Sequence, residues 1–201
     1  MLCSFRGYAM IEVVFRGRGG QGAVIASRLL ALAFHREGKH VQSFPDFAGE
    51  RRGAPVSAFL RVDEREITLR CAIYKADRLI VLDERLADRD ALLRDTREGG
   101  WIVLNTAKSL DHFDCGPRYR LACIDAGQIA VDEGLGTLAL PIVNTAILGA
   151  YARITREVSL DSVLAAIDEA MPYKTQANRN AAKRAYELVT FQNGSQLDVT
   201  G

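Results

Sequence analysis

The chain has 201 residues, of which 26 are basic and 25 acidic, so its formal net charge at neutral pH is +1. This balance gives no electrostatic footprint for nucleic acid or an acidic membrane surface. No apolar run reaches the roughly 18 residues of a membrane span, and the first ten residues do not read as a signal peptide. We expect one domain over residues 10–190, an N-terminal extension at 1–9 and a flexible tail at 191–201.

Apolar runs that alternate with amphipathic stretches predict the secondary structure. The predicted strands are 11–16, 40–44, 56–62, 67–71, 79–82, 101–104 and 118–124. The predicted helices are 21–37, 84–97, 127–133, 142–154, 160–170 and 176–189. This alternation is typical of an α/β, Rossmann-like fold with a mainly parallel sheet flanked by helices. The turn at 63–65 adds a predicted β-hairpin excursion near 56–71.

The four cysteines, Cys3, Cys71, Cys115 and Cys123, are not spaced as metal or iron–sulfur ligands are. Cys71 and Cys123 lie in apolar, strand-like contexts, so we expect buried, reduced thiols. Reduced thiols predict a cytoplasmic protein.

The stretch GRGGQG at residues 17–22 lies between the first predicted strand and the first predicted helix. Gly17 permits a tight turn, Gly19 and Gly20 let a ligand approach the backbone, and Gly22 allows close packing of the helix. Arg16 and Arg18 flank the loop, Gln21 lies within it, and the helix N-terminus favours an anion. The loop therefore predicts a phosphate site, with packing against another chain as the alternative.

A dinucleotide site would also need an acidic residue at the end of the second strand. Asp46 is the only candidate, and it lies beyond a proline. The loop also lacks the Lys-Ser/Thr pair of a nucleotide triphosphatase. Both observations argue against a typical NAD site and against a nucleoside triphosphatase. A stand-alone NAD(P)-binding oxidoreductase and a nucleotide-sensing module are kept as the alternative functions. We identify no catalytic residue and no metal site, although the Asp83–Glu84 pair ends a strand where ligand sites or helix caps occur.

Four stretches together resemble one family: FRGRGGQGAVIASRLLALAF, PDFAGERRGAPVSAFLRV, ADRLIVLD and IVNTAILGAYARI. They are similar to the gamma subunit, or gamma domain, of 2-oxoacid:acceptor oxidoreductases of the pyruvate:ferredoxin type. The likeness runs from about residue 10 to residue 189. It implies a complex that oxidatively decarboxylates a 2-oxoacid, typically to an acyl-CoA, and passes electrons to ferredoxin or a similar acceptor.

The resemblance also assigns individual positions. Its second charged motif falls on Gly49, Glu50, Arg51, Arg52 and Gly53. Ala54 stands where the family commonly has another glycine. The motif asparagine is Asn144, and Asn178 and Tyr186 match the pattern of the last helix. Of these positions, Glu50, Arg51, Arg52, Gly53 and Asn144 are expected to face a substrate or a partner subunit.

The family implies that thiamine diphosphate, magnesium and the iron–sulfur clusters are held by partner subunits of the alpha, beta and delta types. This sequence has neither the thiamine motif nor a cysteine series for clusters. The chain is therefore expected to be a non-catalytic subunit that holds no cofactor alone. The glycine loop would either position the pyrophosphate of coenzyme A or dock a partner, with Glu50 and Arg52 in the interface. The sequence does not decide which 2-oxoacid is used, whether ferredoxin or an NAD-linked subunit accepts the electrons, or the stoichiometry of the complex.

Overall fold

A computed structural model describes residues 10–46 and 55–192 of the chain. Within these residues a seven-stranded sheet has the order β2-β3-β1-β4-β5-β6-β9, and β7 pairs with β8 separately. The strands are β1 (Ile11–Arg18), β2 (His40–Asp46), β3 (Pro55–Asp63), β4 (Ala76–Val81), β5 (Thr96–Asn105), β6 (Arg120–Ile124), β7 (Gly136–Thr137), β8 (Leu140–Pro141) and β9 (Thr190–Gln192). The helices are α1 (Ala23–Arg36), α2 (Arg89–Asp95), α3 (Ala126–Asp132), α4 (Asn144–Thr155), α5 (Leu160–Ala170) and α6 (Thr175–Leu188).

The four central strands are parallel, and antiparallel strands flank them. β1 pairs in parallel with β4, β4 with β5 and β5 with β6. β3 and β9 are antiparallel to their neighbours. The α/β class is thus confirmed, and β1 lies inside the sheet as its continuous apolar run predicts.

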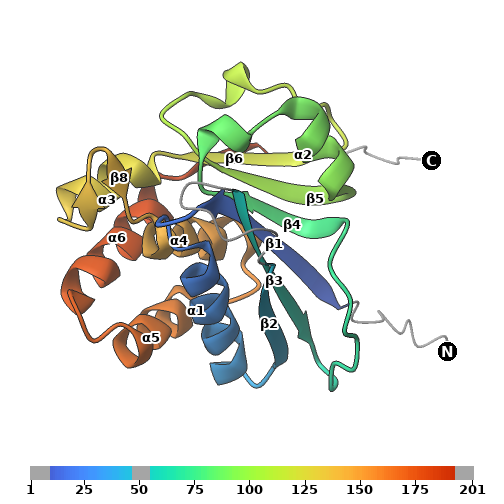
Figure 1. The fold of residues 1–201 in the computed structure, drawn as a ribbon, viewed down its shortest axis with the longest axis horizontal. Helices are drawn as coiled ribbons and strands as arrows, with labels where there is room; N and C mark the ends of the chain where they lie inside the picture. The colour runs from blue at the N-terminus through green and yellow to red at the C-terminus, as the bar shows by residue number, and fades with distance from the viewer. Residues whose placement is uncertain (1–9, 47–54, 193–201) are drawn as a thin grey trace, which may run out of the picture.

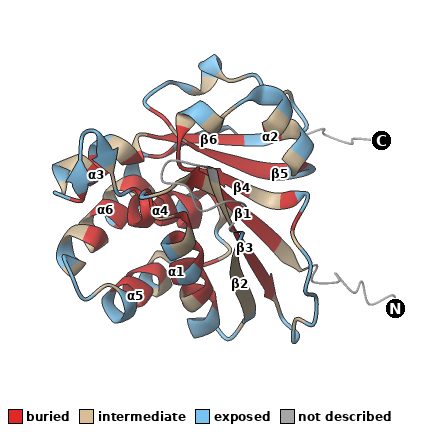
Figure 2. Ribbon diagram, in the orientation of Figure 1, coloured by how far each residue is buried: buried red, intermediate tan, exposed pale blue. Residues whose placement is uncertain are grey.

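Two apolar clusters hold the layers together. Val13 and Phe15 of β1 point into the larger cluster, which contains α1, α4, α5 and α6. Val14 points to the opposite face, where the smaller cluster includes Leu92 of α2. Figure 1 shows the larger helical layer on one face of the sheet and α2 on the other. Figure 2 shows buried residues concentrated along β1, β4, β5 and β6. Because both faces of β1 are covered, its apolar side chains do not alternate with polar ones.

The helices α4 and α6 make the closest approach in the larger layer. A Cβ added at Gly149 of α4 would lie 1.8 Å from the carbonyl oxygen of Ala182 in α6. A glycine is required at this crossing because the two backbones leave no room for a side chain.

The predicted hairpin near 56–71 is wrong in its second strand. β3 pairs with β1 on one side and with β2 on the other, and residues 67–71 are not a strand. The chain at 67–71 instead supplies carbonyl groups to side chains of the sheet. Gln42 Nε2 donates to Leu69 O at 2.7 Å, and Arg61 Nη2 donates to Cys71 O at 2.8 Å. Arg61 is only 1% exposed, so its guanidinium needs these acceptors.

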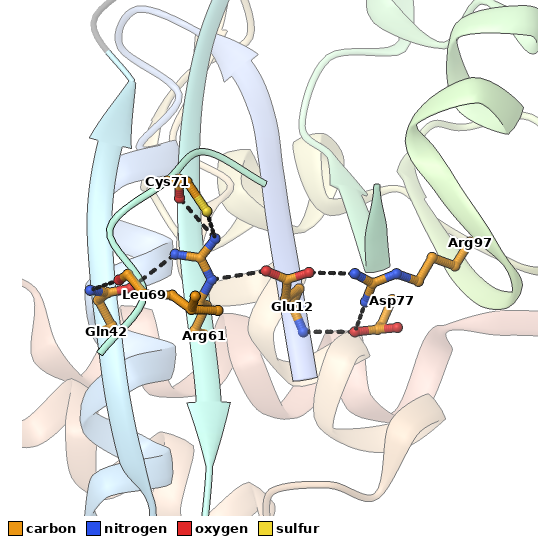
Figure 3. A network of polar contacts seen from close by, with 7 residues as sticks. All are labelled: Glu12, Gln42, Arg61, Leu69, Cys71, Asp77 and Arg97. Atoms are coloured by element: carbon orange, nitrogen blue, oxygen red, sulfur yellow. Dashed lines mark hydrogen bonds and ion pairs between the residues drawn. The ribbon is translucent and has the colours of Figure 1, made fainter. Parts of the chain in front are cut away.

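The Arg61 side chain belongs to a polar network that crosses the sheet (Figure 3). Its Nε lies 2.9 Å from Glu12 Oε1, and Arg97 Nη2 lies 2.5 Å from Glu12 Oε2. Asp77 Oδ2 accepts from the Glu12 backbone amide and from Arg97, each at 2.8 Å. The network therefore joins four strands: β1 through Glu12, β3 through Arg61, β4 through Asp77 and β5 through Arg97.

Other predicted boundaries differ as well, most clearly at three places. The expected helix at 84–97 is a 3₁₀ turn at Glu84–Leu86 followed by the shorter α2. The Asp88 carboxylate caps α2 by accepting from Ala91 N, and the Thr96 hydroxyl donates to Leu92 O where the helix ends. The glycines at 99–100 lie inside β5 and do not precede it. Residues 191–192, expected in the flexible tail, belong to β9.

The cysteines also differ from expectation at one position. Cys71 is exposed, whereas Cys115 and Cys123 are buried. Burial raises the pKa of the Cys123 thiol to about 12. Cys3 lies outside the described residues.

Candidate functional site at the carboxyl edge of the sheet

The carboxyl ends of β1, β4, β5 and β6 meet around one cavity of about 580 Å³. In parallel α/β sheets this edge is where ligands bind. The glycine loop follows β1 and precedes α1, as the sequence predicts, and it lies at this edge of the sheet. The lining includes Arg18, Gln21, Asp83, Arg85, Asn105 and Leu140.

The glycine loop connects β1 to α1 through two residues with positive φ. Gly20 has φ 99° and Gly22 has φ 86°, a conformation that favours glycine. A Cβ at Gly20 would lie 3.3 Å from Leu140 Cδ2. A Cβ at Gly22 would lie 3.0 Å from both Asn144 Cβ and Nδ2. The two glycines therefore serve the turn and allow the β7–β8 hairpin and α4 to approach closely.

Gln21 fixes the shape of this loop from within. Its Oε1 accepts from Arg18 N at 2.8 Å, and its Nε2 donates to Asp83 Oδ2 at 3.1 Å. Gln21 is 8% exposed. Its side-chain hydrogen bonds thus join the loop after β1 to the end of β4.

Asp83 is the buried charged group at the centre of the cavity wall. It is 4% exposed and accepts from Arg85 N, Nε and Nη2 at 3.0, 2.9 and 2.7 Å. Arg18 Nε lies 3.3 Å from Asp83 Oδ2. The hydrogen bonds from the Arg85 side chain lower the pKa of this carboxyl, so it is charged at neutral pH. Two guanidinium groups therefore share one carboxylate.

The two arginines that flank the glycine loop differ in position. Arg18 lines the cavity. Arg16 Nη1 instead lies 2.5 Å from Asp95 Oδ2 at the end of α2, and Arg16 is not in the cavity lining. Among the described residues, Arg85 takes the place that the sequence assigned to Arg16, as the second guanidinium beside the cavity.

The N-terminus of α1 adds to the positive potential. Gly22 provides no side-chain cap, and the first turn contains no acidic residue. Backbone N–H groups in the first turn of a helix have no partner inside the helix. The helix dipole and these amides favour an anion next to Gly19 and Gly20.

The opposite wall consists of polar groups that bond to each other. Asn105 Nδ2 donates to Leu82 O at 2.8 Å, and Gly127 N donates to Asn105 Oδ1 at 3.1 Å. The Thr106 hydroxyl donates to Glu84 Oε2 at 2.6 Å, and Lys108 pairs with Glu84. Asp125 also lines this wall and accepts from Gln128 N at 2.8 Å, so the positive charge that faces a ligand comes from the arginine side.

The β7–β8 hairpin forms the outer rim. Leu138 is 80% exposed and Leu140 is 46% exposed. Both line the cavity. Exposed leucines beside a charged cavity are typical of a surface that another molecule covers.

The motif asparagine Asn144 does not face outward. It is fully buried against Gly22, and its Oδ1 accepts from Thr145 N at 2.8 Å. The Thr145 hydroxyl then donates to Asn178 Oδ1 in α6 at 3.0 Å. Both asparagines thus connect the glycine loop to the helical layer from inside.

The charged motif Gly49, Glu50, Arg51, Arg52 and Gly53 lies outside the described residues. Of the described residues nearest to it in sequence, Pro55 pairs with Arg18, and Asp46 pairs with Ser57.

Within 10–46 and 55–192, no group of three or more His, Cys, Asp or Glu side chains comes together to hold a metal ion. In the same part of the chain, no helix has the length and apolar character needed to cross a membrane.

Comparison with known proteins places this chain in a family. Residues 12–188 match the family model described as pyruvate ferredoxin/flavodoxin oxidoreductase. The chain is 47% identical over 186 residues to pyruvate synthase subunit PorC of Methanocaldococcus jannaschii, covering 92% of this chain and 100% of the relative. It is 45% identical over 183 residues to the common gamma subunit of the pyruvate/ketoisovalerate oxidoreductases of Pyrococcus abyssi, covering 89% and 96%.

A solved structure agrees. The pyruvate oxidoreductase subunit PORC of Thermotoga maritima superposes with a TM-score of 0.76 at 33% identity. The match covers 91% of this chain and 98% of that one.

Proposed function

Because this chain belongs to the pyruvate ferredoxin/flavodoxin oxidoreductase family as a gamma subunit, we propose that its carboxyl-edge cavity positions the phosphate-bearing end of coenzyme A. The observation that carries the proposal is the convergence of Arg18, Arg85 and the loop residues Gly19 and Gln21, which precede α1, on one cavity. Pyrophosphate groups bind well where guanidinium groups and free helix amides meet. A cavity of about 580 Å³ is also in the usual size range of small-molecule sites.

The chemistry of the reaction is assigned to other chains. We infer that thiamine diphosphate, magnesium and the iron–sulfur clusters reside in partner subunits of the alpha, beta and delta types. The support is the absence from this sequence of the family's thiamine motif and of its cluster cysteines. Electrons then leave through ferredoxin or an NAD-linked subunit. Family membership over nearly the whole chain argues against a stand-alone NAD(P) oxidoreductase.

Two further proposals concern the domain organisation and the cellular location. We propose a single domain over residues 10–190 that works in the cytoplasm. The exposed thiol of Cys71 supports this location, because exposed free thiols persist in a reducing compartment.

The substitution Arg18→Ala in the assembled complex tests this function. Loss of one charge-assisted contact of about 1.5–3 kcal/mol raises the KM for coenzyme A about 10- to 150-fold. The KM for the 2-oxoacid stays constant, because other chains bind that substrate. Part of the effect fades at high salt, since Arg18 is partly exposed.

The matched control is Arg36→Ala at the far end of α1, where the arginine pairs with Glu169. This control leaves the KM for coenzyme A unchanged. An unchanged coenzyme A KM in an intact Arg18→Ala complex refutes the proposed contact.

The second candidate function is docking of a partner subunit on the glycine loop. The exposed leucines Leu138 and Leu140 beside the loop favour it. In that case Arg18→Ala weakens assembly and lowers all activities together, which size-exclusion chromatography of the complex detects.

A further inference from the structure

We propose that Arg85, oriented by Asp83, is the residue that binds the anionic group in the carboxyl-edge cavity, and that this group is a phosphate or pyrophosphate. The inference rests on the proposed function and deepens it, because it names a binding residue and a positioning residue that the glycine-loop motif does not contain. The sequence pattern placed Asp83 at a strand end where ligand sites or helix caps occur, but it did not single out Arg85.

The contact between Arg85 and Asp83 uses one edge of the guanidinium. Nε donates to Oδ1 at 2.9 Å and Nη2 donates to Oδ2 at 2.7 Å. These two parallel bonds form a side-on pair, which fixes the plane of the guanidinium. The remaining N–H groups, on Nη1 and the outer side of Nη2, form a second fork on the other edge.

This second fork is available to a ligand. The Arg85 side chain is 71% exposed and lines the cavity. Among the described residues, its polar contacts are those with Asp83. A guanidinium held on one edge and open on the other loses little side-chain entropy when it accepts a planar pair of oxygens.

Asp83 has the properties of a positioning residue. It is nearly buried, and it receives hydrogen bonds from Gln21 of the glycine loop as well as from Arg85. The carboxylate therefore sets Arg85 relative to the loop amides and Arg18. Within this cluster the two guanidinium groups outnumber the one carboxylate, so the positive charge is local to this side of the cavity, which Glu84 and Asp125 also line.

The first experiment titrates inorganic pyrophosphate into the purified full chain by isothermal titration calorimetry. Arg85→Ala weakens binding about 10- to 150-fold, as expected for a charge-assisted bidentate contact. Arg85→Lys keeps the charge but loses the fork, and still weakens binding about 10-fold. Arg118→Ala is the matched control, because Arg118 is also 71% exposed and pairs with Glu98 at 2.6 Å. A wild-type chain that fails to bind millimolar pyrophosphate overturns the inference, as does an Arg85→Ala chain that binds like the control.

The substitution Asp83→Asn tests the positioning role by the sign of its effect. It raises the net positive charge of the cavity but releases the side-on pair. We expect pyrophosphate to bind about 5-fold or more weakly, with partial recovery in Asp83→Glu. Tighter binding in Asp83→Asn shows that the carboxylate only competes with the ligand, and overturns the positioning role. Where thermal melting shows that Asp83→Asn does not fold, Arg85→Lys alone decides on the fork.

Kinetics of the assembled complex separate this inference from the proposed function. A rise in the coenzyme A KM with both Arg18→Ala and Arg85→Ala supports both. Lost pyrophosphate binding in Arg85→Ala with an unchanged coenzyme A KM keeps the anion site and refutes coenzyme A as its ligand. In a third outcome, Arg18→Ala raises the coenzyme A KM, but Arg85→Ala changes neither the coenzyme A KM nor pyrophosphate binding. This outcome supports the proposed function and refutes the role of Arg85.

Discussion

Replacing Gly149 with alanine should force the helices α4 and α6 apart. The added Cβ would lie 1.8 Å from Ala182 O, 2.6 Å from its carbonyl carbon and 2.9 Å from its Cα. All three atoms belong to the backbone, so no side-chain rotation relieves the contact. The α6 backbone has to withdraw by more than an ångström to reach normal van der Waals separation.

The cost follows from what the crossing buries. Ala146, Ala150 and Ala182 are fully buried at or beside the contact, and a shift of the helices opens gaps around them. Overpacking in a core typically costs about 1–3 kcal/mol and more where backbone must move. Alanine regains at most about 1 kcal/mol in helix propensity. We therefore expect a net loss of about 2 kcal/mol, or about 4–8 °C in Tm for a domain of this size.

Thermal and urea unfolding of the purified chain, followed by circular dichroism, measure this loss. Gly127→Ala is the matched control, because that helical glycine has room for a Cβ at 3.5 Å from Asp125 Oδ1 and 3.7 Å from Pro141 Cγ. The control should be neutral or slightly stabilising. A Gly149→Ala chain with the Tm of the wild type or of the control would refute the close crossing of α4 and α6.

Two further predictions concern buried polar groups. Glu12→Gln leaves the buried Arg61 guanidinium without its counter-charge and should lower the free energy of unfolding in urea by about 3–5 kcal/mol. The double variant Glu12→Gln/Arg61→Met should recover part of that loss, and a single variant that costs under about 1 kcal/mol would contradict the network. Burial raises the pKa of Tyr151 well above its usual value. The stability from its neutral hydroxyl is therefore complete below about pH 10 and falls above it, by up to about 1.4 kcal/mol per pH unit. Tyr151→Phe should lose this alkaline dependence in urea titrations, and an unchanged slope would disprove it.

Local pattern was sufficient for the core of the fold but not for strand pairing. The continuous apolar run at 11–16 and the glycine motif after it depend on residues close in sequence, and both lie where predicted. The alternation at 56–62 also predicts a strand correctly, but it contains no information on the partner. The hairpin strand predicted at 67–71 from the turn at 63–65 is wrong, because Leu69 and Cys71 instead supply carbonyl groups to Gln42 and Arg61.

In the candidate site, too, features that depend on neighbouring residues could be predicted, whereas long-range contacts could not. The glycine loop, Arg18 and the strand end at Asp83 were visible as local motifs. The bond from Gln21 to Asp83 joins residues 62 positions apart, so no local pattern contains it. Arg85 enters the site through a 3₁₀ turn that Asp83 caps, where the sequence pattern predicts an ordinary helix. Long-range hydrogen bonds and one short turn therefore account for the residues that were missed.

The insertion of β2 and β3 between α1 and β4 places the strand that carries the glycine loop inside the sheet. β3 pairs along one side of β1 from Pro55 to Val62, and β4 pairs along the other side. Because both sides of β1 are occupied, β1 offers no open edge to a strand of another chain. A molecule that binds beside the glycine loop therefore has to contact loops and side chains, and cannot extend the sheet through β1.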